Sequence, residues 1–332
     1  MTPSISACLM SHSAISVHGV SVDEPLIVAH DVVKRYGDFV AVNGLNLTVP
    51  KGQAFGFLGP NGAGKSTTMR MVGCISEPTS GSLQVLGMET ATNGADIRAR
   101  LGVVPQEDTL DTEITLMENL VIYARYFGIK YRVAKQRARE LLEFVQLADR
   151  ADMMVDELSG GMKRRLTIAR ALVNEPDVMM LDEPTTGLDP QARHLVWERL
   201  FQLKQRGITI ILTTHYMDEA EQLCDRLVIM DGGVIAAEGS PRQLIERHVT
   251  KDVVELRFAG KHTDELSDLA DKLDGIDAQV EALPDRILLY TNDAEAIATQ
   301  VYDRKVEPTS LLERRATLED VFLRLTGRSL IE

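Results

Sequence analysis

The sequence is poor in cysteine and in basic residues. Its three cysteines, Cys8, Cys74 and Cys224, are odd in number and far apart, so they form neither a disulfide framework nor a metal-binding spacing. Free cysteines of this kind are typical of a reducing cytosol. There are 36 Lys and Arg against 49 Asp and Glu, which gives a formal net charge of −13. Because a phosphate backbone demands clustered positive charge, we expect no nucleic-acid partner.

The sequence also lacks a segment that could cross a membrane. No apolar stretch approaches the roughly 18–20 residues that a helix needs to span a bilayer. No Lys or Arg precedes Lys34, so the N-terminus lacks the basic start of a secretion signal. We therefore expect that the chain does not span a membrane.

The 332 residues leave room for one large domain and a small one, and 44% hydrophobic residues suffice for a packed core. Residues 1–25, rich in Ser, Ala and His without a clear period, are expected to form a flexible N-terminal tail. From 26 to 245, apolar strands alternate with helical segments, which predicts a mostly parallel α/β sheet. The clearest buried strands are expected at 54–58, 178–181 and 209–212.

A helical subdomain is expected at about 107–165. Thr115 and Glu118 have the spacing of a capping box, and the amphipathic runs 120–127 and 138–145 follow them. After residue 246 the sequence pattern changes, and a small βαββα accessory domain is predicted for 246–332. Its strands are expected at 253–258, 278–282 and 287–290, its helices at 264–273 and 294–302, and a closing helix at 318–323. An extension of the main sheet is the alternative.

A phosphate-binding loop of the form G-x-x-x-x-G-K-S follows the first of these strands. Its glycines let backbone N–H groups turn inward around phosphate oxygens, and Lys65 would reach the β- and γ-phosphates of ATP. Ser66 would hold Mg²⁺, and a chance Gly-rich turn is disfavoured because a strand precedes the loop and a helix follows it. The ATP-binding residues expected here are Gly59, Pro60, Asn61, Gly62, Ala63, Gly64, Lys65, Ser66 and Thr67.

Two carboxylates, Asp182 and Glu183, end the second buried strand. Asp182 is suited to Mg²⁺ coordination, and Glu183 can polarise a water for attack on the γ-phosphate. Alone, this would be an ordinary acidic strand end. Both motifs fall at carboxyl ends of parallel strands, where α/β sheets bind their ligands, so together they indicate a nucleotide hydrolase.

A third motif narrows the class. It opens the helical segment 163–173 and consists of Leu158, Ser159, Gly160, Gly161 and Met162. This resembles the signature of the ABC ATPases, with Met162 in place of the usual final Gln. The resemblance covers about 27–245, and it implies that Tyr36 stacks on adenine, that Gln106 of the Q-loop binds ATP and metal, that Asp189 lies in the D-loop and that His215 is the switch histidine. With Glu183 and Lys65, His215 would be catalytic.

Each of these residues has a plainer interpretation on its own. Tyr36 could be a packing residue, Gln106 an ordinary loop amide and His215 a capped strand end. Asp189, which precedes Pro190, could be a helix N-cap. Their common order and spacing relative to the phosphate loop favour the family roles. Three consecutive basic residues, 163–165, are interpreted as a solvated helix face rather than a phosphate site.

A narrower resemblance rests on 158–165, 181–199, 213–227 and 318–328. These segments are similar to the ATP-binding subunits of nodulation-type lipo-oligosaccharide exporters and of daunorubicin-type drug exporters. The resemblance implies a P-loop ABC ATPase core, made of a mostly parallel sheet with an antiparallel β part and a helical subdomain, plus a small C-terminal α+β domain. It also implies a separate transmembrane permease, a peripheral position on the cytoplasmic side of the inner membrane, and an amphiphilic cargo.

In this family the phosphate loop and the signature meet only across a head-to-tail dimer, so each ATP would lie between Lys65 of one copy and Ser159 of the other. The second copy can be the same chain or a second ATPase. Because every motif lies upstream of residue 246, the segment 246–332 is expected to be dispensable for the hydrolytic fold.

The main alternative is a soluble ABC ATPase that acts in DNA repair or on the ribosome. The interval 66–158 has no sustained heptads of the kind that a chromosome-maintenance coiled coil needs, and the chain has one ATPase half rather than two. A regulatory module that does not hydrolyse ATP is the other alternative, but both Glu183 and His215 are present.

Overall fold

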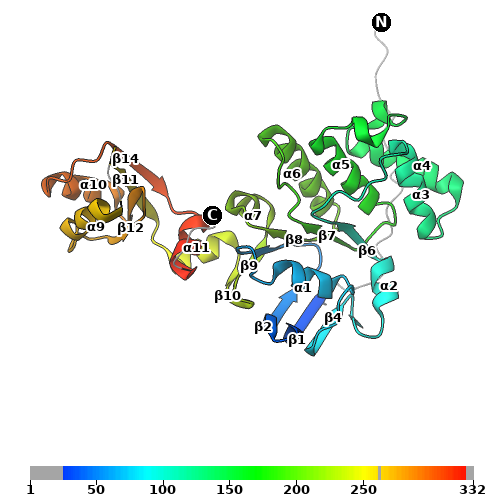
Figure 1. Cartoon of the computed structure of the whole chain (residues 1–332), viewed down its shortest axis with the longest axis horizontal. Coiled ribbons are helices and arrows are strands. Elements are labelled where there is room, and N and C mark those ends of the chain that lie inside the picture. The colour runs from blue at the N-terminus through cyan, green and yellow to red at the C-terminus, as the bar shows by residue number, and fades with distance from the viewer. Residues whose placement is uncertain (1–24, 261–262, 327–332) are drawn as a thin grey trace, which may run out of the picture.

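The computed structural model describes residues 25–260 and 263–326 (Figure 1). The predicted N-terminal tail therefore lies outside the described residues, apart from its last position. Within the described part of the chain, no helix combines the length and the apolar character that crossing a membrane requires.

A six-stranded sheet forms the centre of the molecule, with the strand order β10-β9-β3-β8-β7-β6. All neighbours pair in parallel except β9 and β10, which pair antiparallel. The predicted mostly parallel sheet is thus confirmed, and its continuously apolar strands are buried on both faces. The strands are β3 (Ala54–Leu58), β6 (Leu101–Val104), β7 (Val178–Asp182), β8 (Thr209–Thr214), β9 (Arg226–Asp231) and β10 (Val234–Gly239).

A second, antiparallel sheet has the order β2-β1-β4-β5 and shares an apolar cluster with β3 and α1. Phe55 and Phe57 of β3 lie in this cluster with Met69 and Met71 of α1, so the antiparallel sheet supports the segment that follows β3. Its strands are β1 (Ile27–Tyr36), β2 (Phe39–Val49), β4 (Ser80–Val85) and β5 (Met88–Glu89). The helices of this part of the core are α1 (Lys65–Val72) and α2 (Gly94–Ala99).

The helical part between β6 and β7 has its own apolar core. The capping box is confirmed: the Thr115 hydroxyl accepts from the Glu118 N–H, and the Glu118 carboxylate accepts from the Thr115 N–H. The helix α4 begins earlier than predicted, because its first turns are exposed and only Ala134, Ala138 and Leu142 turn inward. This part contains α3 (Leu116–Tyr126), α4 (Tyr131–Phe144) and the first half of α5 (Gly160–Ala171), with 3₁₀ turns at Ala148–Arg150 and Val155–Glu157.

Three helices pack on the face of the six-stranded sheet that is opposite the antiparallel sheet. They are α6 (Pro190–Gln205), α7 (Met217–Leu223) and α8 (Pro241–His248). The helix α8 begins with a second capping box, in which the Ser240 hydroxyl accepts from the Gln243 N–H, and it leads directly into the C-terminal segment.

The C-terminal segment forms an antiparallel sheet with the order β12-β13-β11-β14. The predicted elements are present, and one strand was missed. That strand, β14, pairs with β11 along its whole length, but it is an edge strand with the polar sequence Glu313, Arg314, Arg315 and gives little period-2 signal. The elements are β11 (Asp252–Arg257), α9 (Thr263–Lys272), β12 (Gln279–Ala282), β13 (Arg286–Thr291), α10 (Ala294–Asp303), β14 (Ser310–Arg315) and α11 (Leu318–Thr326).

The last helix, α11, packs against both the main α/β part of the chain and the C-terminal sheet. Figure 1 shows it between the C-terminal sheet and the rest of the molecule. Phe322 and Val321 are fully buried in the same apolar cluster as Leu223 of α7 and Leu244 of α8. The cluster that includes Val254 and Leu256, by contrast, stays within the C-terminal domain. The division of the chain at residue 246 stays a prediction. The packing of α11 argues against the expectation that 246–332 is dispensable for the hydrolytic fold.

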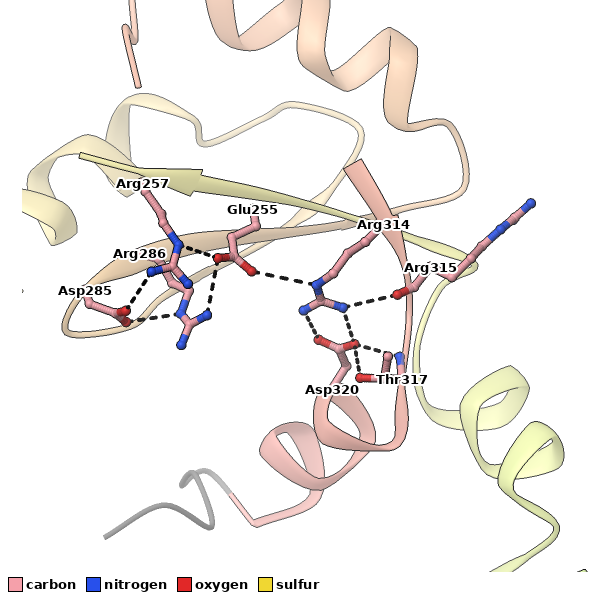
Figure 2. Close-up of polar contacts among 8 residues, drawn as sticks. All are labelled: Glu255, Arg257, Asp285, Arg286, Arg314, Arg315, Thr317 and Asp320. Carbon is pink, nitrogen blue, oxygen red and sulfur yellow. Dashed lines mark hydrogen bonds and ion pairs between the residues drawn. The ribbon is translucent and has the colours of Figure 1, made fainter. Parts of the chain in front are cut away.

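A buried polar network fixes α11 to the C-terminal sheet (Figure 2). Arg314 of β14 donates to both carboxylate oxygens of Asp320, at 2.7 and 2.8 Å, and its Nε lies 3.7 Å from Glu255. Asp320 is fully buried and also accepts from the Thr317 N–H at 2.8 Å. Because a bidentate arginine–carboxylate pair is both strong and directional, α11 is held at its first turn while its apolar face enters the core.

Truncation after residue 245 is therefore expected to yield an aggregated chain. It would remove α11 and expose the apolar residues of α7 and α8 that it covers. As a matched control, the full-length Leu256→Ala variant should cost about 2–5 kcal/mol in the C-terminal domain only and keep ATP binding. Size-exclusion chromatography and ATP titration of both proteins provide the measurement. A monodisperse, ATP-binding truncated chain would show that the core does not need α11.

Candidate active site

The phosphate loop lies between β3 and α1 and has the backbone that its glycines permit. Gly62 and Gly64 have φ values of 81° and 99°, in the region that favours glycine. A Cβ on Gly59 would lie 2.3 Å from the carbonyl oxygen of Met230, so no side chain fits there. The first turn of α1 contains no acidic residue and no side-chain cap, which leaves its positive end suited to an anion.

Lys65 is the first residue of α1 and is only 5% exposed. Its Nζ donates to the carbonyl oxygens of Gly59 at 2.7 Å and Pro60 at 3.0 Å, so the side chain folds back over the loop. Burial lowers the pKa of Lys65, while the negative charges of Glu183 and Asp182 act in the opposite direction. A phosphate bound in the loop would add negative charge beside this buried ammonium.

Lys65→Ala is expected to weaken ATP binding by about 10- to 100-fold, since it removes a charge-assisted contact worth roughly 1.5–3 kcal/mol. Lys130→Ala removes the same charge from an exposed position before α4 and should bind ATP like the wild type. Equilibrium titration with ATP at a fixed Mg²⁺ concentration measures both variants. An unchanged dissociation constant for Lys65→Ala would contradict the assignment.

Asp182 lies at the end of β7, where two hydroxyl groups approach it. Ser66 Oγ of α1 donates to Asp182 Oδ1 at 3.4 Å, and Thr213 Oγ1 of the adjacent strand β8 donates to the same oxygen. A hydroxyl and a carboxylate at this spacing are hard oxygen donors of the type that Mg²⁺ prefers. In the described residues, no group of three His, Cys, Asp or Glu side chains could hold a metal.

Glu183 is the residue at which the predicted site residues converge. Gln106 Nε2 donates to Glu183 Oε2 at 3.1 Å, and His215 Nδ1 lies 3.2 Å from Glu183 Oε1. Thr186 Oγ1 also donates to Oε2, at 3.2 Å. In this arrangement the Gln106 amide contacts the carboxylate of Glu183, and its role at a metal stays a prediction.

The backbone at Glu183 is unusual. Its φ is 45°, in the left-handed region that a residue other than glycine rarely adopts, and its side chain is largely buried. The Glu183 N–H is held by both the carbonyl oxygen and the hydroxyl of Thr213, each at 3.1 Å. Backbone strain of this kind is concentrated at functional sites, where the surrounding structure compensates for it.

Tyr36 ends β1, and the residue is 47% exposed. Lys34 Nζ lies 5.1 Å from the ring centroid, which is a cation–π distance. A residue exposed to this extent contributes little to the core, so the packing interpretation is disfavoured, and stacking on adenine stays a prediction.

The signature residues lie at the start of α5. Ser159 is exposed and caps the helix by accepting from the Met162 N–H at 3.4 Å. A Cβ on Gly160 would meet nothing within 4 Å, whereas one on Gly161 would lie 2.7 Å from Cβ of Ala192 in α6. Gly161 is therefore required for helix packing. Figure 1 shows α5 and α1 on opposite sides of β7 and β8, so one chain does not bring the signature to its own phosphate loop.

Asp189 caps α6: its side chain accepts from the Ala192 N–H at 2.9 Å, and Pro190 follows in the first turn. The simple capping interpretation is thus right about its local structure. Its D-loop role in a dimer stays a prediction.

The interpretation of residues 163–165 as a solvated face was wrong for two of them. Arg165 donates to the carbonyl oxygen of Val145 at 2.8 Å, and Arg164 donates to carbonyl oxygens around the active site. A signal was available in the sequence: Arg164 is spaced four and seven residues from Ile168 and Ala171, which are buried, so it falls on the inward row of α5.

The comparisons with known proteins agree with this geometry. Residues 42–186 match the family model described as ABC transporter, and residues 267–327 match the C-terminal domain of the nodulation factor export protein NodI. The chain is 48% identical over 302 residues to Nod factor export ATP-binding protein I of Burkholderia lata, covering 90% of this chain and 96% of that protein. It is 50% identical over 299 residues to the protein of that name from Rhizobium sp. strain N33, with the same coverage.

Solved structures of ATP-binding cassettes share the fold. The dimeric post-hydrolysis state of the cassette MJ0796 bound to ADP and phosphate is 28% identical, with a TM-score of 0.59, and covers 64% of this chain and 98% of that one. The cassette cbiO1 of Clostridium perfringens, part of the transporter complex cbiONQ, is also 28% identical, with a TM-score of 0.63, and covers 68% and 92%.

The fold and the site thus define an ABC-type ATP-binding subunit, an ATPase of the class that drives transport. The chain belongs to the family of Nod factor export ATP-binding protein I, since the similarity extends over both the ATPase core and the C-terminal domain.

Proposed function

We propose that the chain binds MgATP at the carboxyl ends of β3, β7 and β8 and hydrolyses it with Glu183 as the residue that polarises the attacking water. The observation that carries this proposal is the convergence of Gln106, Thr186 and His215 on the Glu183 carboxylate. A carboxylate that accepts hydrogen bonds from two side chains and faces a histidine at a strand end is positioned to orient a water next to the γ-phosphate.

The other residues would bind and neutralise the nucleotide. Lys65 and the first turn of α1 hold the β- and γ-phosphates, Tyr36 stacks on the adenine, and Ser66 with Asp182 holds Mg²⁺. When bound, Mg²⁺ neutralises charge on the phosphate oxygens. The remainder of the ATP cradle is Gly59, Pro60, Asn61, Gly62, Ala63, Gly64, Thr67 and Gln106, with Leu158, Ser159, Gly160, Gly161 and Met162 supplied by a second copy.

We further infer that the chain works as a homodimer on the cytoplasmic side of the inner membrane, bound to a separate permease. The separate permease is inferred from the family, whose relatives are named as ATP-binding subunits of exporters, and the described residues contain no helix that could cross a membrane. The cargo class is a lipo-oligosaccharide, supported by relatives that are named for Nod factor export and match both parts of the chain. A soluble ATPase in repair or on the ribosome is the disfavoured alternative.

The test uses inverted membrane vesicles from cells that express the chain together with a candidate six-span permease. ATP should drive uptake of a labelled lipo-oligosaccharide, and the Glu183→Gln variant should abolish this uptake. Daunorubicin serves as a second probe. Uptake of daunorubicin alone would contradict the proposed cargo, and failure of the chain to bind the vesicles would contradict the permease.

A further inference from the structure

Arg164 lies in the second turn of α5, five residues after Ser159, and its partly buried guanidinium contacts the backbone of the active site. Its Nε donates to the carbonyl oxygen of Pro184 at 2.7 Å. Its Nη2 donates to the carbonyl oxygens of Asp182 at 3.0 Å and Glu183 at 3.2 Å. Its Nη1 donates to the carbonyl oxygen of Pro105, the residue before Gln106. One side chain therefore binds the backbone on either side of the hydrolytic residues.

Only arginine can make this set of contacts. The guanidinium is a planar fork with five N–H donors, whereas a lysine ammonium has three donors around a single nitrogen. The acceptors belong to two segments, the end of β7 and the residue after β6, which the sheet pairs as far as Leu181 and Val104 and which Arg164 joins beyond the last paired residues. The hydrogen bonds are made to backbone, so they fix the position of the segments whatever their side chains do.

The carboxyl group of Glu219 lies near Arg164, and burial raises the pKa of this carboxyl group. Glu219 of α7 is fully buried and accepts from Thr185 Oγ1 at 2.8 Å and from Trp197 Nε1 at 3.2 Å. Burial lowers the pKa of Arg164 to about 10, while the charges of Glu219, Asp182 and Asp108 act against this, so the guanidinium is still a cation at neutral pH. The Arg164 cation and the buried Glu219 carboxyl group thus enclose the turn that follows Glu183.

We propose that Arg164 is a positioning residue that links the signature helix to Gln106 and Glu183, so that the placement of Ser159 and the placement of the hydrolytic residues depend on each other. In the head-to-tail dimer, Ser159 serves the ATP bound by the other copy, while Gln106 and Glu183 serve the chain's own ATP. The link therefore couples the two sites of the dimer. This last step rests on the proposed function.

The first experiment separates binding from turnover in the full chain. Arg164→Met should keep the dissociation constant for ATP within about 2-fold and lower kcat by about 100-fold, as expected when catalytic groups are misplaced. Arg164→Lys should lower kcat by about 10-fold. The matched control is Arg165→Lys, which makes the same change one residue along α5, where the guanidinium contacts the helical part. A kcat for Arg164→Lys equal to that of Arg165→Lys would overturn the positioning role.

The second experiment tests the link to the signature in the Glu183→Gln background, in which hydrolysis is blocked and the closed dimer accumulates. Adding Arg164→Lys should lower the ATP-dependent closed fraction by at least about 3-fold, whereas adding Arg165→Lys should leave it unchanged. An equal closed fraction in both would show that Arg164 serves only its own site and would overturn the link. If Glu183→Gln alone forms no closed dimer, the proposed function fails at that point, and the kcat comparison still decides whether Arg164 positions the hydrolytic residues.

Discussion

Glu183→Gln is expected to lower ATP turnover by about 1,000-fold and to leave ATP binding intact, within the range of 10²- to 10⁴-fold that a general base contributes. The amide keeps the size of the side chain and an oxygen that can accept from Gln106 and Thr186. It loses the negative charge that polarises water and that faces His215 at 3.2 Å. Because the phosphate loop is untouched, ATP still binds but is not consumed.

The measurement combines steady-state hydrolysis with size-exclusion chromatography in ATP, where the variant should run as a stable dimer. Glu295→Gln, the same substitution at an exposed position in α10, is the control and should match the wild type. Turnover at the wild-type rate by Glu183→Gln would rule out Glu183 as the hydrolytic residue.

The sequence was sufficient to predict which residues meet at the site. Lys65, Glu183 and His215 are about 30 to 150 residues apart along the chain, yet each follows a strand of one sheet. The order β3-β8-β7-β6 makes these strands neighbours, and their parallel direction brings all the carboxyl ends to one edge. The strand-end argument therefore predicted that the phosphate loop and the carboxylates Asp182 and Glu183 lie at one edge, and the resemblance added His215. Neither predicted the contacts of the Glu183 side chain or its left-handed backbone.

What was missed depends on tertiary structure. The strand β14 is defined by its pairing with β11 and has no apolar period of its own. For Arg164, by contrast, the spacing of four and seven residues from Ile168 and Ala171 was a usable signal, which the interpretation of three adjacent basic residues as a solvated face overlooked. The docking of α11 joins residues about 75–100 positions apart, such as Phe322 and Leu223, and no local pattern reports such a contact.

Two variants that fail to close alone, Lys65→Ala and Ser159→Arg, are expected to restore ATP-driven closure when they are mixed. In a head-to-tail dimer of Lys65→Ala and Ser159→Arg chains, one composite site has both defects. The other composite site pairs an intact Lys65 with an intact Ser159. Each homodimer, by contrast, has one defect in both of its sites. Since the signature lies away from the phosphate loop of its own chain, such rescue can arise only between chains.

Cross-linking across the interface in ATP measures the closed dimer in the mixture and in each variant alone, and the mixture should exceed both. Ser159→Arg also removes a helix N-cap, a loss of about 1 kcal/mol, so Ser240→Arg, which removes the cap of α8 in the same way, is the matched control. A Ser240→Arg chain has an intact signature, so it should form the closed homodimer without the other variant. If heterodimers form and the mixture still shows no more closed dimer than either variant alone, two identical chains do not share the site through Lys65 and Ser159. An obligate second ATPase would then be the partner to seek.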